Sequence, residues 1–170
     1  MLEIVNRYAG TWRLLLQYDE DTLAKPKEGH DATEDFEIAS VHSAIASLKR
    51  DLAEKGEATA LFGQERGHGL EGIIGSIYQT FGGRSLYPSV EEKGAHLLYF
   101  VIKDHPFSDG NKRIGTFLFV LFLQVNGLLD QLHFDNKGLV ALALLTAASE
   151  PSQKDLLVRL IMNLLAGDEG

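Results

Sequence analysis

Nine consecutive residues concentrate the polar chemistry of this chain: His105-Pro106-Phe107-Ser108-Asp109-Gly110-Asn111-Lys112-Arg113. A loop that only turns the chain needs one or two polar residues, whereas this run supplies a base, an acid and two cations around a glycine. His105 can take a proton, Asp109 can hold a hard cation, and Arg113 can grip a phosphate through two parallel hydrogen bonds. The combination predicts an enzyme site that handles phosphate.

The run leads into a strongly apolar helix, which we expect from about residue 111 to residue 125 and ended by Asn126-Gly127. The start of a helix has free backbone N–H groups and about half a positive charge, and both attract anions. Gly110 allows the backbone to approach a ligand closely. Lys112 and Arg113 oppose the positive end of the helix dipole, so we expect an anion to compensate them.

Two of these residues also have ordinary structural explanations. An aspartate before a helix is a routine N-cap worth about 1 kcal/mol, and for Asp109 taken alone this is the better explanation. Beside a phosphate site, Mg²⁺ binding becomes the better one, because Mg²⁺ commonly joins one carboxylate to substrate phosphates. His105 follows a helix, where its role can be purely structural, and as a base it must be largely neutral near pH 7.

Size and composition indicate one domain, residues 1–170, in which 45% hydrophobic residues exclude disorder. The net charge of −8, from 24 acidic and 16 basic residues, argues against binding to nucleic acids or anionic membranes. Without cysteine there are no disulfides or thiolate metal sites. Glu3 and Asn6 interrupt any signal peptide, and the longest apolar run, residues 117–123, is too short to span a bilayer, so we expect a cytoplasmic protein.

An apolar period of 3.6 residues recurs along the chain and predicts an all-α fold. The repeating positions are Val5, Tyr8, Trp12 and Leu15; Val41, Ile45, Leu48 and Leu52; Leu70, Ile73, Ile74, Ile77 and Phe81; Leu97, Leu98, Val101 and Ile102; Leu139, Leu142 and Leu145; and Leu156, Leu157, Leu160, Ile161 and Leu164. We expect a core at about residues 70–130, with the helices of residues 1–60 and 136–166 packed on it. The stripe through Trp12 is expected to be core, with a dimer surface as the alternative.

Local signals place a small β-hairpin and several helix ends. Gly82-Gly83 favours a tight turn, and Tyr87 suits a strand. Ser89, with a glutamate three residues later, predicts a capped helix start, and Asp135 predicts another. Pro106 ends the preceding helix near residue 103 or 104.

The nine-residue run resembles the signature of the Fic/Doc family, His-Pro-Phe-x-(Asp/Glu)-Gly-Asn-(Gly/Lys)-Arg, in its lysine-containing form. Residues 70–130 also follow the family's order of hairpin flap, helix, motif loop and central helix. The resemblance implies a Fic-type helical bundle around a buried central helix, with one small β-hairpin flap. It also implies a transferase that uses ATP and Mg²⁺ to move a phosphate-containing group to a Ser, Thr or Tyr hydroxyl of a target protein.

The resemblance also implies a role for each matching residue. His105 corresponds to the general base, Asp109 to the Mg²⁺ ligand, and Phe107 to the residue that anchors the loop in the core. The residues implied to bind the nucleotide phosphates are Gly110, Asn111, Lys112 and Arg113. The flap implied to bind an extended target segment comprises Gly82, Gly83, Arg84, Ser85, Leu86 and Tyr87. An ordinary hairpin is an equal alternative for the flap.

Three positions decide which group the resemblance predicts to be transferred. Members that transfer AMP usually have glycine where Lys112 stands and a second arginine where this chain has Thr116. The Doc branch shares Asn-Lys-Arg and donates the γ-phosphate, but often has alanine in place of Gly110. We therefore favour phosphoryl transfer, with AMP transfer as the alternative. A non-catalytic nucleotide-binding regulator is a further alternative, but it predicts a damaged motif.

The sequence contains few signals for how the protein is inhibited or whether it forms oligomers. Two segments partly match the family's inhibitory helix, Thr33 with Glu37 and Thr146 with Glu150, but neither continues with glycine or asparagine. We regard both as chance matches and expect control by a separate antitoxin-like inhibitor protein or by a further domain. A homodimer is compatible with the sequence, although no specific feature indicates one. A zinc hydrolase is disfavoured, because His105 and a single carboxylate are too few ligands.

Overall fold

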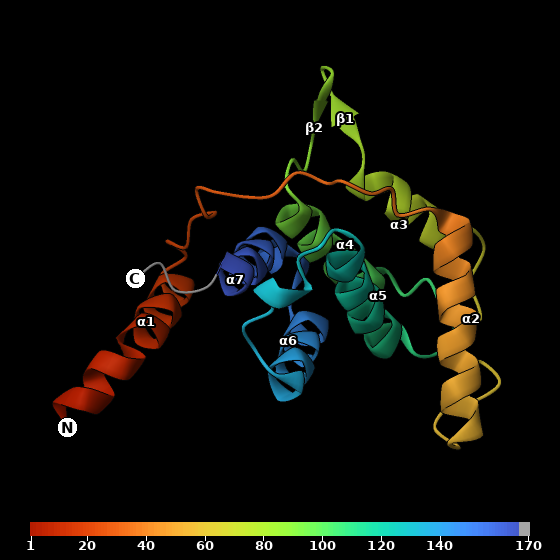
Figure 1. Ribbon diagram of the computed structural model, residues 1–170, viewed down its shortest axis with the longest axis horizontal. Coiled ribbons are helices and arrows are strands. Elements are labelled where there is room, and N and C mark those ends of the chain that lie inside the picture. The colour runs from red at the N-terminus through yellow and green to blue at the C-terminus, as the bar shows by residue number, and fades with distance from the viewer. Residues whose placement is uncertain (167–170) are drawn as a thin grey trace.

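The computed structural model describes residues 1–166 as a helical bundle with one small hairpin (Figure 1). The helices are α1 (Leu2–Asp19), α2 (Ile38–Glu54), α3 (Gly69–Ile77), α4 (Val90–Asp104), α5 (Asn111–Val125), α6 (Asn136–Ala148) and α7 (Lys154–Ala166). The hairpin pairs β1 (Thr80–Phe81) with β2 (Arg84–Ser85), and short 3₁₀ turns cover Leu129–Gln131 and Pro151–Gln153. The predicted all-α class with a single hairpin is confirmed.

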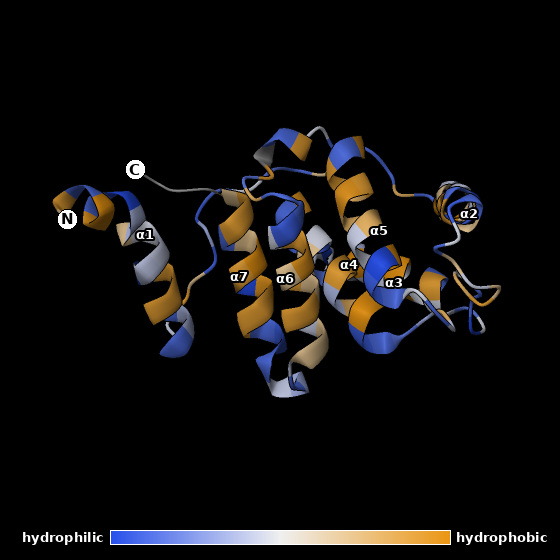
Figure 2. Cartoon of the chain, turned by 90° about the horizontal axis from the view of Figure 1, so that it is seen from below, coloured by the Kyte–Doolittle hydropathy of each residue, from blue (hydrophilic) through white to orange (hydrophobic). Residues whose placement is uncertain are grey.

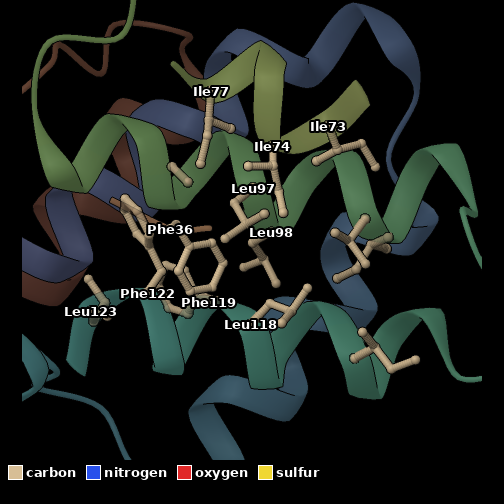
Figure 3. Packing of buried hydrophobic residues seen from close by; sticks show 14 of the residues in the cluster. Phe36, Ile73, Ile74, Ile77, Leu97, Leu98, Leu118, Phe119, Phe122 and Leu123 are labelled. Carbon is tan, nitrogen blue, oxygen red and sulfur yellow. The ribbon is translucent and has the colours of Figure 1, made fainter. Parts of the chain in front are cut away.

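The core lies where α3, α4 and α5 meet (Figure 3). Leu97 and Leu98 of α4 face Leu118 and Phe119 of α5, and all four side chains are fully buried. Twelve of the 15 residues of α4 are buried, against six of the 15 in α5. The bundle therefore has a buried central helix, but this helix is α4, whereas the apolar composition of α5 indicated α5.

The predicted helix ends are largely confirmed. The Ser89 hydroxyl accepts a hydrogen bond from the Glu92 N–H at 3.1 Å, and the Asp135 carboxylate accepts one from the Gly138 N–H at 2.9 Å. α5 begins at Asn111 and is followed by Gly127 at φ 72°. The Glu92 side chain does not close the capping box, because it forms an ion pair with Lys25 instead.

That ion pair belongs to a long segment without regular structure, residues 20–37, which we call the strap. In Figure 1 the strap crosses the molecule from α1 to α2. The His30 carbonyl accepts a hydrogen bond from the Val90 N–H at 2.8 Å, at the start of α4. Phe36, only 5% exposed, packs edge-on against Phe122 with ring centroids 5.3 Å apart. The strap therefore fixes one end of α4 and covers part of the core.

The first helix departs from the sequence prediction. No residue of α1 is buried, and Trp12 is 48% exposed, so the stripe through Trp12 is not core in this structure. Figures 1 and 2 show α1 set apart beside α7. Two hydrogen bonds connect the start of the strap to α7: Arg159 to the Asp21 carboxylate at 3.0 Å, and Asn163 to the Ala24 carbonyl at 2.8 Å. Among residues 1–166, no helix combines the length and apolarity that crossing a membrane requires.

Candidate active site at the start of α5

The motif loop joins α4 to α5 and is braced from within by Asn111. The Asn111 Oδ1 atom accepts a hydrogen bond from the Phe107 N–H at 3.0 Å, and its Nδ2 atom donates to the Phe107 carbonyl at 2.9 Å. Phe107 itself is 1% exposed and belongs to the core. Because a backbone N–H can only donate, it fixes the orientation of the Asn111 amide. The loop is therefore anchored by one buried ring and one amide.

A second segment, residues 57–66, pairs with the motif loop along its backbone. Asp109 accepts a hydrogen bond from the Gly63 N–H at 3.1 Å, and the Ser108 N–H donates to the Gln64 carbonyl at 2.8 Å. The Arg66 N–H donates to the Pro106 carbonyl at 2.8 Å. Sequence reasoning missed this segment, because it has no helical or strand period and its partner lies far along the chain. These backbone hydrogen bonds hold the loop in place, and Phe62 of the same segment belongs to the core.

Phe62, from the same segment, explains why residue 110 is glycine. Gly110 has φ 89°, a conformation that L side chains rarely adopt. A Cβ atom at this position would also stand 2.5 Å from Cδ2 of Phe62, which is fully buried. We expected the glycine to admit a ligand. The structure gives it a packing role as well, because the Phe62 ring lies where a side chain would be.

Asp109 and Arg113 lie together at the start of α5. The Arg113 Nη2 atom is 3.8 Å from the Asp109 Oδ2 atom, and the guanidinium lies 4.6 Å from the centroid of the Phe62 ring. Residues 57–66 contact both side chains: the Thr59 hydroxyl donates to Asp109 at 2.9 Å, and the Glu57 carbonyl accepts from Arg113 at 2.6 Å. The two side chains are 40% and 46% exposed, so both remain accessible to a ligand.

His105 lies at the C-terminal end of α4 in the left-handed conformation, with φ 50°, and its side chain is exposed. Its Nδ1 atom is 3.3 Å from the Asn111 Nδ2 atom, which is a donor. In this arrangement Nδ1 therefore carries the lone pair of the neutral ring. This contact between His105 and Asn111 is long for a hydrogen bond, and the Asn111 amide also donates to the Phe107 carbonyl at 2.9 Å. A substrate hydroxyl can therefore replace Asn111 at Nδ1 of His105 at little cost in free energy.

The anion-attracting end of α5 is open. Gly110 is the N-cap residue, and no side chain of the described residues caps this helix start. The first backbone N–H groups of a helix have no partner within the helix, so they can bind an anion here. Lys112 is exposed in the first turn beside them. The four residues 110–113 are thus brought together as a group.

A cavity of about 450 Å³ lies beside His105, between α3 and the end of α4. Arg66, Ser76 and Phe100 are among its lining residues, and it reaches His105 at one end. Burial raises the pKa of Asp104, which lines the same cavity, and the nearby charges of Lys154 and His105 oppose that increase. The cavity offers room for a group presented to the imidazole.

The flap is not brought together with the motif loop. It precedes α4, whereas the motif loop follows it, and 15 residues of α-helix span roughly 20 Å. Gly82 and Gly83 form the predicted turn with φ 60° and 78°, and Phe81 is 84% exposed. Tyr87, in contrast, lies under the hairpin, stacked on His96 with ring centroids 3.6 Å apart. The exposed part of the flap therefore excludes Tyr87, which is only 9% exposed.

The remaining three flap residues differ in exposure. Arg84 pairs with Phe81 across the hairpin and is exposed. Leu86 is 46% exposed, whereas the Ser85 hydroxyl donates to the Tyr87 carbonyl at 3.1 Å. Lys93 of α4 is 5% exposed and donates to both the Ser85 hydroxyl and the Tyr87 carbonyl. The flap base is thus fixed to α4 by a buried cation that sequence reasoning did not identify.

Among residues 1–166, no hydrogen bond or ion pair joins Glu37 or Glu150 of the two partial matches to the motif loop, although Lys103 donates to the Ser149 carbonyl at 2.6 Å. Thr33 donates its N–H to Asn126 at 3.1 Å, at the opposite end of α5 from Gly110. Thr146 is fully buried and donates its hydroxyl to the Leu142 carbonyl at 2.8 Å within α6. Thr116, where a second arginine would stand, donates to the carbonyls of its own helix.

The residues present suit a magnesium ion that arrives with a nucleotide. No group of three or more His, Cys, Asp or Glu side chains that could hold a metal occurs within residues 1–166. Mg²⁺ does not require one, because it commonly binds one or two carboxylates together with substrate phosphates. Asp109, partly exposed at the anion-attracting end of α5, fits that pattern.

Comparison with known proteins identifies the family. No curated protein and no solved structure gives a significant match to this chain. The sequence profile described as the Fic/DOC family matches residues 35–123, which include α2 to α4, the hairpin, the motif loop and all but the last two residues of α5. Because this match covers more than half of the 170 residues, the chain belongs to the Fic/DOC family.

Proposed function

We propose that this protein transfers a phosphate-containing group from ATP to a hydroxyl side chain of a target protein, and that the group is the γ-phosphate. The observation that carries the proposal is the placement of His105 within 3.3 Å of Asn111, at the uncapped start of α5. An exposed imidazole and an anion-attracting helix end thus lie side by side. Membership of the Fic/DOC family supports the general type of reaction.

In the proposed reaction the nucleotide phosphates lie on the backbone N–H groups at the start of α5, and Arg113 binds a phosphate oxygen. Lys112 adds positive charge to the same end. Mg²⁺, held by Asp109 and the phosphates, would neutralise negative charge when bound. His105 takes the proton from the target hydroxyl, whose oxygen attacks the γ-phosphorus. The bond from the γ-phosphorus to the bridging oxygen breaks, and ADP leaves with its electron pair.

One feature favours γ-phosphate transfer over AMP transfer, and a second removes an objection to it. The arginine expected in AMP-transferring relatives is replaced by Thr116, whose hydroxyl is bonded to carbonyls of its own helix at 2.9 and 3.0 Å and does not supply a cation. Gly110, which differs from the alanine common in the Doc branch, is accounted for by the Phe62 ring beneath it. The glycine therefore gives no support to AMP transfer.

We propose that the target segment lies in the cavity between α3 and α4. This cavity extends from His105 past Gly72 and Ser76 of α3, and β1 begins only four residues after Ser76. A segment in this position would connect the flap with the imidazole. A target segment in the cavity could reach both sites although the length of α4, roughly 20 Å, separates the flap from the imidazole.

Isotopic labelling tests the transferred group. The purified chain, Mg²⁺ and a cell lysate are incubated with ATP labelled at either the α or the γ position. Label on protein from the γ position alone is the expected result. Label from the α position alone would reject phosphoryl transfer in favour of AMP transfer, and no label from either would support a nucleotide-binding regulator.

Replacing the proposed base tests the mechanism. His105→Ala should lower the transfer rate by about 10²–10⁴-fold, because general-base catalysis contributes an effect of this size. It should leave the thermal unfolding temperature nearly unchanged, since the His105 side chain is exposed. His68→Ala, which removes another exposed histidine, is the control and should retain full activity. An undiminished rate in His105→Ala would reject the assignment of the base.

A further inference from the structure

A second hollow lies between α1 and α7 and has a volume of about 1080 Å³. We call it the α1–α7 groove. Figure 1 shows α1 beside α7 at one end of the molecule and α2 at the other. Since residues 57–66, which follow α2, contact the motif loop, the groove lies well away from the candidate active site. Neither the motif nor the proposed reaction accounts for it.

Cationic side chains are concentrated in the lining of the groove. Four cationic residues line it, Arg7, Arg13, Lys25 and Lys27, and within the described range 1–166 none of its lining residues is a carboxylate. Lys25 is paired with Glu92, but the other three make no ion pair with any residue in the range 1–166. The whole chain carries a net charge of −8, whereas the described lining of this groove carries four cations. Such a surface attracts a negatively charged partner.

The orientation of α1 adds to this evidence. Residues 7, 10, 14 and 17 recur at helical spacing and face the groove, so α1 turns a largely polar, basic face toward its own protein. Its apolar stripe, including Tyr8 and Trp12, lies on the other face and is about half exposed. An amphipathic helix that only covered a core would have the reverse orientation. The groove face of α1 is therefore better suited to an anionic ligand than to core packing.

Apolar side chains also line the groove, namely Leu14, Leu23, Phe134 and Leu164. This lining decides between classes of anionic ligand. Nucleic acids bind through phosphate contacts and stacking on successive aromatic rings, and this groove offers only the partly buried Phe134 ring and the small imidazole of its neighbour His133. A peptide can offer carboxylates to the cations and aliphatic side chains to the leucines. Sites for small molecules are typically roughly 300–1,000 Å³, so this open groove is large enough for a chain segment.

We propose that the α1–α7 groove binds an acidic, amphipathic segment of a partner protein. The carboxylates of that segment pair with Arg7, Arg13 and Lys27, and its apolar side chains contact Leu14 and Leu164. This binding is independent of the transfer reaction, because the groove shares no lining residue with the cavity beside His105.

A designed peptide serves as the probe. It is roughly 15 residues long, the length at which an isolated helix becomes marginally stable, with glutamates on one face and leucines on the other. Its binding to the full chain is measured by fluorescence anisotropy of a dye on the peptide. Arg7→Glu/Arg13→Glu should weaken binding by about tenfold or more, as should replacing the peptide glutamates by glutamines. Arg50→Glu/Lys137→Glu, which makes the same change of charge outside the groove, should retain the affinity within about twofold.

Trp12, the only tryptophan of the chain, reports where the peptide binds. It is not a lining residue of the groove, so its emission should stay nearly constant when the groove is filled. A large blue shift, with binding abolished by Trp12→Ala, would place the peptide on the outward stripe and overturn the proposal. Equal binding of the glutamine peptide would overturn it as well.

Two other occupants are tested with the same variants. If a single-stranded RNA of equal charge binds more tightly than the peptide and loses affinity in Arg7→Glu/Arg13→Glu, the groove is a nucleic-acid site and the proposal fails. If the chain self-associates in analytical ultracentrifugation and the same variant abolishes this, the occupant is a second copy, and the proposal of a separate partner fails.

Discussion

At the scale of single residues, Gly110 carries two constraints that can be measured separately. Its φ of 89° costs an L residue about 1–2 kcal/mol, and the contact with Phe62 adds a clash typical of overpacking, about 1–3 kcal/mol. Gly110→Ala should therefore lower the free energy of unfolding by about 2–5 kcal/mol in urea denaturation. Gly127, just past the other end of α5, is the matched control.

Gly127 has φ 72°, and a Cβ atom there would meet nothing within 4 Å. Gly127→Ala should cost only the conformational part, about 1–2 kcal/mol. Equal losses for the two variants would show that Phe62 yields without cost, and the packing explanation for Gly110 would then be wrong.

The candidate catalytic residues were predictable from sequence because their types and spacing lie within nine positions. His105, Asp109 and Arg113 needed no knowledge of the fold. Phe62 and Lys93 were not predictable, since each acts through a tertiary contact. Phe62 lies under a glycine far along the chain, and Lys93 is a lysine on an otherwise ordinary helix, where burial is uncommon for that residue.

At the scale of elements, α3 offers a test of the proposed target path. Gly72 lines the cavity beside His105, whereas Gly75 does not, and neither would bring a Cβ atom within 4 Å of another group. Gly72→Phe should raise KM for the target protein by about tenfold or more, because a phenyl ring would occupy the cavity. KM for ATP should stay unchanged.

Gly75→Phe is the control, with the same new side chain on the same helix. Both variants should fold, because replacing a helical glycine removes the entropic cost of glycine, and the new Cβ atom meets nothing within 4 Å at either position. If Gly75→Phe impairs target modification as much as Gly72→Phe, the target segment does not lie in this cavity.

The contact between the flap base and α4 makes stability depend on pH. Burial lowers the pKa of His96 from 6.5 to about 4, with Lys154 and Lys25 contributing in the same direction, against the Glu92 carbonyl and carboxylate. The unfolded chain therefore binds a proton near pH 6.5 that the folded chain excludes. Stability is fully present above pH 6.5 and is lost as the pH falls toward 4, by roughly 2 kcal/mol between pH 6.5 and 5.

Urea denaturation at several pH values between 7 and 5 measures this slope, and His96→Gln should remove most of it. His68→Gln, at a histidine whose side chain is 93% exposed, should keep the slope of the natural chain. A His96→Gln chain whose stability falls as steeply as before would show that other groups cause the dependence.

Sequence periodicity and helix caps predicted most of the helices. They did not predict the segments whose hydrogen-bond partners lie far along the chain. The starts of α4, α5 and α6 follow from Ser89, the motif loop and Asp135. The strap and residues 57–66 have no period of their own, and they are ordered by hydrogen bonds to distant parts of the chain. The period and turn signals of a single sequence contain no information on such contacts.

At the scale of the whole molecule, the chain divides into a densely packed part around α4 and a peripheral α1. Residues of α3, α4 and α5 form one buried cluster together with Phe36 of the strap (Figure 3). α1 contributes no residue to that cluster. The sequence pattern of α1 could not reveal this, because an apolar stripe at helical spacing looks the same whether it faces a core or solvent.

Two large aromatic residues test this division. Phe36→Ala should lower the free energy of unfolding by about 3–5 kcal/mol, since it empties a buried position against Phe122. Trp12→Ala should cost less than about 1 kcal/mol, because nearly half of the larger side chain is already exposed. Amide hydrogen exchange should agree, with α1 exchanging long before α4. If Trp12→Ala lowers the free energy of unfolding as much as Phe36→Ala does, the apolar stripe of α1 is covered by another group in solution. If the loss in Trp12→Ala also depends on protein concentration, that group is a second copy of the chain.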